Sequence, residues 1–129
     1  MREVSIYSIG GCDAGTRIGY CETVLEYEGR TKYLRMDLTD TTANRCIIQG
    51  LINGVVALKE ACNVKLITST PAGVQKGMKG EGVNADLILK LIGELTRKGC
   101  MYAFDARVDQ GDVLRRFIRN VQLKAQQSK

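Results

Sequence analysis

The chain has 129 residues, of which 44% are hydrophobic and 26% charged, and its 19 basic and 14 acidic residues give a net charge of +5. This balance predicts a single globular domain over residues 1–129 and argues against a disordered chain, because enough apolar surface is present to build a core. No apolar run approaches the ~20 residues of a membrane span, and the N-terminus lacks the pattern of a secretory signal. The absence of histidine excludes Ser-His-Asp and Cys-His catalysis and any zinc site that needs imidazole.

The chain has five widely spaced cysteines: Cys12, Cys21, Cys46, Cys62 and Cys100. No C-x-x-C pair occurs, so neither a zinc ribbon nor a thioredoxin-type motif is indicated. The odd number and wide spacing predict reduced, mostly buried thiols in a cytoplasmic protein rather than a disulfide framework.

The first part of the chain predicts three antiparallel strands. Residues 4–9 alternate apolar and polar side chains, and a turn-rich loop follows over 10–15. Residues 18–27 are rich in Thr, Val, Ile and Tyr, which favours a second strand. Glu28 and Gly29 form a turn signal, and residues 31–38 alternate again, so the third strand is expected to pair with the second.

A long helix is expected next, capped by Thr41 or Thr42. Its apolar positions, 47, 48, 51, 52, 55, 56 and 58, form a wide stripe, so the helix is expected to be buried over much of its surface. Asn63 is expected to end this helix, and residues 64–68 are expected to form a short buried strand. Thr70 followed by Pro71 predicts the start of a short helix, with a cap residue and then a proline at the first helical position.

The last part predicts two helices on either side of a strand. Asn84 caps the first of these helices, and Gly99 closes it. A strand follows over 100–106. The final helix is expected to start near Asp109 or Gln110, with apolar residues at 113, 114, 117, 118 and 121.

The resulting order, β-β-β-α-β-α-α-β-α, and several segments resemble the type 1 ribonuclease H family. IYSIGG resembles the first-strand motif Y-T-D-G-S, and TTANRCII resembles T-T-N-N-R-M-E-L at the start of the first helix. VKLITST lies in a segment similar to the fourth strand, and NADLILKLIGEL resembles a helix that begins N-x-D-L-W. The resemblance covers roughly residues 4–122, with 123–129 as a basic tail. It implies an α/β fold with a five-stranded mixed sheet and helices on both faces.

Enzymes of this family cut the RNA strand of an RNA–DNA hybrid with two divalent metals, which four carboxylates hold. Carried over by position, these carboxylates fall on Ile9, on Ile47, on Ser69 or Thr70, and on Arg115 or its neighbour Leu114. None of these side chains is a carboxylate. We therefore expect no catalytic residue at these positions, no bound metal, no cofactor, and a domain that is not an enzyme.

Other positions match residues that touch nucleic acid in the family. A helix N-terminus offers free N–H groups to phosphate, and the charge excess lies in residues 113–129, which hold five basic and no acidic residues. The preferred interpretation is binding of an RNA–DNA hybrid or duplex without cleavage. The predicted contact residues are Gly10, Gly11, Thr42, Asn44, Arg45, Arg115 and Arg119.

Two alternatives to this interpretation remain open. In the first, the same residues only cap helices and carry surface charge. The domain then serves protein interaction or assembly, with a protein partner or a second copy, and no membrane partner is expected. The second alternative is an active metal-dependent ribonuclease with a rearranged site. Its carboxylates would come from Asp13, Asp37, Asp105, Asp109 and Asp112.

Overall fold

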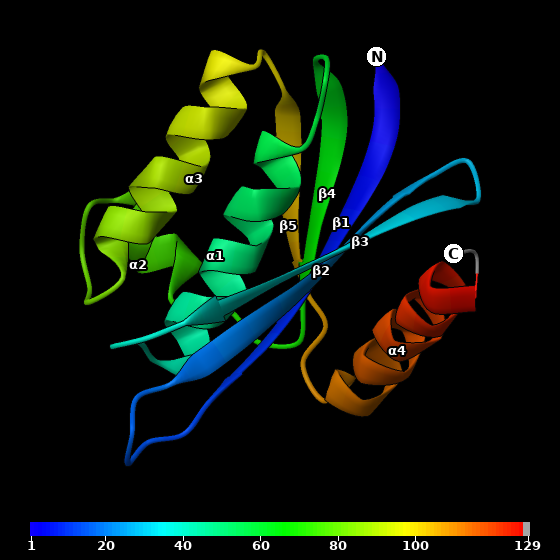
Figure 1. Ribbon diagram of the computed structural model, residues 1–129. Helices are drawn as coiled ribbons and strands as arrows, with labels where there is room; N and C mark the ends of the chain where they lie inside the picture. The colour runs from blue at the N-terminus through cyan, green and yellow to red at the C-terminus, as the bar shows by residue number, and fades with distance from the viewer. Residues whose placement is uncertain (128–129) are drawn as a thin grey trace.

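The computed structural model describes residues 1–127 and forms an α/β fold on one mixed sheet (Figure 1). Its elements are β1 (Arg2–Cys12), β2 (Gly19–Tyr27), β3 (Arg30–Leu38), α1 (Ala43–Val56), β4 (Cys62–Thr68), α2 (Val74–Met78), α3 (Ala85–Arg97), β5 (Met101–Ala106) and α4 (Gly111–Gln127). Within these residues the sheet has five strands in the order β3-β2-β1-β4-β5. The predicted order of elements and the fold class are confirmed.

Strand β1 lies at the centre of the sheet, where it pairs antiparallel with β2 and parallel with β4. The register places Ile9 opposite Glu22 and Gly10 opposite Cys21. Because side chains alternate along a strand, paired residues on neighbouring strands point to the same face. The register therefore decides which side chains of β2 lie beside the end of β1.

Helices cover both faces of the sheet, with α1 and α3 on one side and α4 on the other (Figure 1). Val4 and Ile6 of β1 join the apolar cluster under α1 and α3. Ile9 points the other way, into a second cluster that also contains Val24 and Ile67 of the sheet and Leu114, Ile118 and Val121 of α4. The two clusters are the two halves of the core, and they fix the end of β1 between α1 and α4.

Helix α1 begins at the predicted cap, since the Thr42 hydroxyl accepts a hydrogen bond from the Arg45 amide. It ends beneath Lys98, whose ammonium donates to the carbonyl oxygens of Val55, Val56 and Leu58 at 2.9, 2.7 and 2.5 Å. These carbonyls lie at the negative end of the helix dipole, where a cation is favourable. Lys98, just after α3, thus ties that helix to the C-terminus of α1.

Several predicted details are wrong. The short helix α2 begins at Val74 and not at Pro71, because Ala72 and Gly73 have φ of +51° and +72° and form a left-handed turn before it. Val56 and Val113 were assigned to buried stripes but are 53% and 57% exposed. The segment expected as a basic tail, 123–129, is helical over residues 123–127, where α4 continues. Residues 128–129 lie outside the described residues.

Three of the five cysteines, Cys21, Cys46 and Cys62, are buried as expected, and all five are free in the structure. Over residues 1–127, none of the helices combines the length and the apolar composition that a membrane span requires.

Candidate functional site

Two glycines at the end of β1 bring its backbone against α1 and β2. A Cβ atom at Gly10 would lie 2.8 Å from the Cβ of Cys46, and one at Gly11 would lie 2.9 Å from the ring of Tyr20. Larger residues therefore do not fit without movement of their neighbours. Both glycines are half-buried, so the backbone keeps one side open to solvent.

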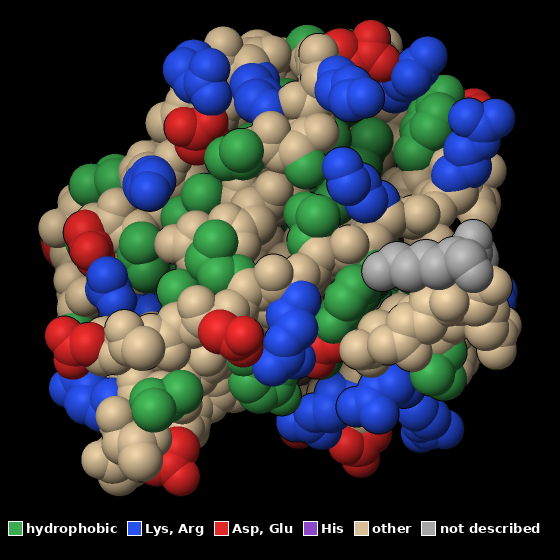
Figure 2. All heavy atoms as spheres, viewed as in Figure 1, with side chains coloured by type: hydrophobic (Ala, Val, Ile, Leu, Met, Phe, Trp, Pro, Cys, Tyr) green, Lys and Arg blue, Asp and Glu red, His purple; other side chains and the backbone are tan. Residues whose placement is uncertain are grey.

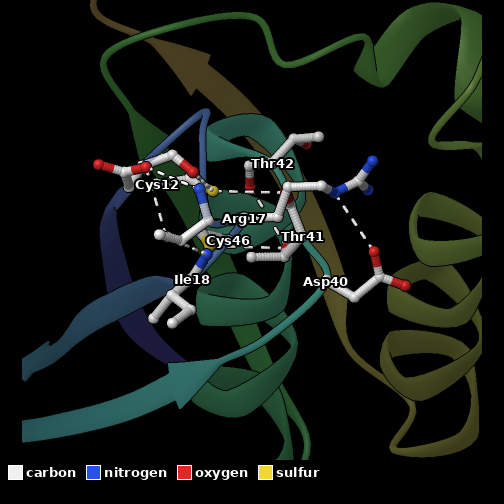
Figure 3. Close-up of polar contacts among 9 residues, drawn as sticks. Cys12, Arg17, Ile18, Asp40, Thr41, Thr42 and Cys46 are labelled. Atoms are coloured by element: carbon white, nitrogen blue, oxygen red, sulfur yellow. Dashed lines mark hydrogen bonds and ion pairs between the residues drawn. The ribbon is translucent and has the colours of Figure 1, made fainter.

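The N-terminus of α1 lies beside this strand end (Figure 3). Thr42 and Asn44 are exposed, and the Thr42 side chain occupies only one of the free amides of the first turn. Ala43 and Asn44 of this turn are exposed, and the free amides and positive dipole end of a helix N-terminus favour an anion. The structure thus places the predicted residues Gly10, Gly11, Thr42 and Asn44 in one region.

Arg45 forms an ion pair within the protein, and its contact with nucleic acid stays a prediction. Its guanidinium donates to both carboxylate oxygens of Asp86 at 3.0 and 2.9 Å, and to the Asn84 side chain at 3.5 Å. This bond raises the pKa of Arg45, and the same bond lowers the pKa of Asp86. Arg45 therefore joins the N-terminus of α1 to that of α3, and its side chain is only 29% exposed.

The positions carried over for the family's carboxylates are largely apolar and buried. Ile9 is 8% exposed, Ile47 is 6% and Leu114 is 2%. Ile47 thus belongs to the buried stripe predicted for α1. Isoleucine and leucine side chains offer no oxygen ligand, so these residues do not fit a pair of divalent cations. The assignment of these positions to the family's ligands stays a prediction.

The end of β4 and the start of α4 complete this edge of the molecule. A Cβ at Gly111 would lie 3.9 Å from the Cβ of Ser69, so the two elements are in contact there. Ser69 and Thr70 are half-buried, and Thr70 accepts a hydrogen bond from the Ala72 amide at 3.4 Å inside the turn before α2. Thr70 is thus a turn residue and not a helix cap.

Basic side chains gather over the first half of α4 (Figure 2). Arg115, Arg116 and Arg119 are exposed, because Leu114 and Ile118 occupy the buried face of the helix. Arg115 pairs with Asp112 at 3.1 Å, with both side chains largely exposed, so the pair is weak and screened by water. Lys124 lies farther along the helix, and Lys129 lies outside the described residues.

The candidate carboxylates of a rearranged site are engaged locally. Asp13 accepts from the amides of Gly15 and Thr16 at 2.8 Å each, and the Thr16 bond is the main cause of its lowered pKa. The others are paired or lie in turns: Asp37 with Arg35, Asp105 with Arg107, Asp112 with Arg115, and Asp109 at φ +66°. Among residues 1–127, no three His, Cys, Asp or Glu side chains are placed to hold a metal ion.

One buried carboxylate near this edge was missed by the sequence analysis. Glu22 lies opposite Ile9 in the sheet, is 7% exposed, and accepts a hydrogen bond from the Tyr33 hydroxyl at 2.5 Å. Burial and the Glu22 contact raise the pKa of Tyr33 to about 12. Its pairing with Ile9 places the glutamate on the α4 side of the sheet, and this register is not visible in the sequence.

A second missed feature is a stack of two side chains above Gly11. The guanidinium of Arg35 lies 4.8 Å from the centre of the Tyr20 ring, which in turn covers Gly11. Arg35 also donates to Asp37 at 3.1 Å, and its side chain remains 45% exposed. The stack adds a cation beside the glycine backbone at the end of β1.

Known proteins with related sequences are ribonucleases H. The chain is 35% identical over 80 residues to a protein named Ribonuclease H from Desulforamulus reducens, a match that covers 62% of the chain and 50% of that relative. It is 38% identical over 77 residues to a Ribonuclease H from Legionella pneumophila, covering 60% of the chain and 53% of the relative. The matched part thus spans about half the length of these relatives. No family model matches the chain.

A solved structure agrees with these relatives. The fold matches the N-terminal RNase H domain of a Mycobacterium tuberculosis protein, solved as a fusion with maltose-binding protein, with a TM-score of 0.69 and 16% identity over 99% of both chains. The chain is therefore ribonuclease H-like in sequence and in fold, and the predicted resemblance is confirmed.

The prediction that the domain is not an enzyme is contradicted by these relatives. Several of them carry the name Ribonuclease H, which points to an enzyme. The prediction relied on the side chains at four positions only. Activity depends on every group around the reacting atoms, so those four positions were too narrow a basis for excluding it.

Proposed function

We propose that this ribonuclease H-like domain binds an RNA–DNA hybrid or a related duplex along the edge where β1 ends and α1 and α4 begin. The observation that carries the proposal is the open first turn of α1 beside the glycine backbone of β1, with exposed arginines of α4 at the same edge of the fold. Backbone amides and guanidinium groups are the usual partners of phosphate. Such contacts provide affinity without reading sequence.

The proposed contacts divide between the two sides of the sheet. On one side, Gly10, Gly11, Thr42 and Asn44 offer backbone and small polar groups that approach a groove closely. On the other side, Arg115 and Arg119 are four residues apart and share an exposed face of α4. A rigid duplex that lies across the sheet edge would meet both groups. Arg45 supports the first group by holding α1 against α3.

Metal-dependent cleavage of the RNA strand is a second candidate, favoured by the names of the relatives. Hard divalent cations need oxygen ligands, which Ile9 and Ile47 do not supply. Cleavage by this chain would therefore use other carboxylates near the same edge. Glu22 and Asp112 are two carboxylates that lie on the α4 side of the sheet and on α4 itself.

A fluorescence-anisotropy titration of a short labelled hybrid at several salt concentrations tests the binding proposal. We expect affinity at low salt that falls as salt rises, because phosphate contacts release counterions. The double variant Arg115→Gln/Arg119→Gln should bind more weakly on all sequences, with the salt slope reduced by about one unit for each lost contact. The matched control is Arg97→Gln, an exposed arginine at the end of α3.

Three outcomes separate the candidates. If the parent and the double variant bind with equal affinity and equal salt dependence, α4 is not part of the interface. No binding by the parent at low salt would refute the proposal and favour protein interaction. Incubation of the labelled hybrid with Mg²⁺ or Mn²⁺ tests the second candidate, which predicts RNA fragments that disappear with EDTA and diminish in Glu22→Gln or Asp112→Asn.

A further inference from the structure

Two thiols from distant parts of the chain meet at Thr41. The Cys12 thiol at the end of β1 donates to the Thr41 carbonyl oxygen at 3.3 Å, and the Cys46 sulfur in α1 lies 3.7 Å from the Thr41 hydroxyl (Figure 3). Both sulfurs therefore contact the same residue, at the junction between the strand end and the helix.

Gly19 leaves the space between the two thiols open. It pairs antiparallel with Cys12, so the side-chain positions of residues 12 and 19 point to the same face of the sheet. A Cβ at Gly19 would lie 2.8 Å from the Cys46 sulfur. A larger residue at position 19 would thus contact the Cys46 sulfur on the face of the sheet that also carries Cys12. Because residue 19 is glycine, this position places no side chain beside the Cys46 sulfur.

The two thiols differ in access to solvent. Cys12 is half-buried and lines a hollow of about 310 Å³ together with Arg17 and Thr42. Cys46 is fully buried, and this burial raises the pKa of its thiol. A small oxidant in solution therefore reaches Cys12 first, and Cys46 lies behind it as the second thiol.

We propose that Cys12 and Cys46 form an oxidation site that a peroxide converts to a disulfide. The Cys12 thiol loses its proton, the thiolate attacks one peroxide oxygen and the O–O bond breaks. The departing hydroxide takes up that proton, so the products are a sulfenic acid and water. The Cys46 sulfur then attacks the sulfenic sulfur, the S–O bond breaks, and the departing hydroxide takes the Cys46 proton as a second water. The two cysteines lose two electrons, which the peroxide gains. This inference does not depend on nucleic-acid binding.

Cys21 is the nearest competitor for Cys46. It lies opposite Gly10, whose own side-chain position faces the Cβ of Cys46, so it is also close to that residue. However, Cys21 is 1% exposed, and burial raises the pKa of its thiol to about 11. It is therefore a poor first target for an oxidant. A disulfide between Cys21 and Cys46 is the alternative product that the experiment must distinguish.

The test is disulfide mapping of the intact protein after brief treatment with hydrogen peroxide. Free thiols are then blocked with iodoacetamide, and the protein is digested without reductant. We expect the five free thiols to fall to three, the monomer to lose the mass of two hydrogens, and one linked peptide pair to contain Cys12 and Cys46. Cys12→Ser should abolish the internal bond, whereas Cys62→Ser, a buried cysteine elsewhere in the core, should leave it unchanged.

Two results would overturn the proposal. One is an internal bond between Cys21 and Cys46, or between Cys62 and Cys100, while Cys12 remains alkylated. The other is oxidation of Cys12 to sulfinic acid with Cys46 still free. Both results are measured on the unsubstituted protein, so they stand even if a variant folds poorly.

Discussion

Alanine substitutions at two helix glycines should have opposite effects on stability. Gly54 faces the sheet from α1, where an added Cβ would lie 2.5 Å from a methyl of Ile6, a side chain with no exposed surface. Gly93 lies on the exposed face of α3, where an added Cβ meets no atom within 4 Å. Gly54→Ala therefore strains the core, whereas Gly93→Ala only restricts the unfolded chain.

The magnitudes follow from two effects. Replacing glycine by alanine in a helix stabilises it by about 0.5–1 kcal/mol, and overpacking a core costs about 1–3 kcal/mol. Because Ile6 is held on all sides, Gly54→Ala should lose about 1–2 kcal/mol net. Gly93→Ala should gain the full stabilisation of about 0.5–1 kcal/mol that alanine gives a helix. For a chain of this length, about 1 kcal/mol changes Tm by roughly 4 °C.

Urea denaturation followed by far-UV circular dichroism measures both variants against the parent. We expect the midpoint to fall for Gly54→Ala and to rise for Gly93→Ala, with unchanged slopes, since the surface exposed on unfolding is the same. A Gly54→Ala protein as stable as Gly93→Ala would refute the close packing of α1 on β1.

Three further substitutions test other parts of the structure. Lys98→Met removes three hydrogen bonds to the end of α1 and should lower the free energy of unfolding by about 1–3 kcal/mol, whereas Lys90→Met on the exposed face of α3 should change it by less than about 0.5 kcal/mol. Ile47→Glu places a charge among buried groups and should cost about 2–4 kcal/mol, so an unchanged Tm would show that this position is open to water. Tyr33→Phe removes the donor to Glu22. Because burial and Glu22 raise the pKa of Tyr33 from 10 to about 12, the stabilisation is fully present below pH 10 and is lost as the pH rises toward 12. The difference in stability between parent and Tyr33→Phe should therefore shrink over that range in denaturation curves, and a constant difference would contradict the assignment.

Local sequence signals predicted most of the architecture. Strand alternation and the Glu28–Gly29 turn predicted the antiparallel strands, and Thr42 and Gly99 marked helix ends correctly. The Pro71 signal failed because a left-handed turn follows the proline, and a cap pattern does not reveal that turn. Val113 failed because an apolar residue next to a buried stripe has the same pattern whether or not a partner covers it.

The site was harder to predict because its decisive contacts join residues that are far apart in the chain. Arg45 resembled a free cation at a helix start, but packing of α1 against α3 brings it onto Asp86. Glu22 resembled a surface residue of a strand, but the register places it beside Ile9 and under Tyr33. Contacts of this kind depend on tertiary packing, and no local pattern encodes them.

Chemical-shift mapping of the protein with a short RNA–DNA hybrid tests the proposed interface most directly. In ¹⁵N–¹H spectra at low salt, we expect the largest changes at the amides of Gly10, Gly11 and Asn44 and along the first half of α4, and these changes should fade as salt is added. Shifts confined to the hollow at the opposite end of β1, lined by Glu3, Glu28 and Asn63 among others, would contradict the account, as would a spectrum that the hybrid leaves unchanged.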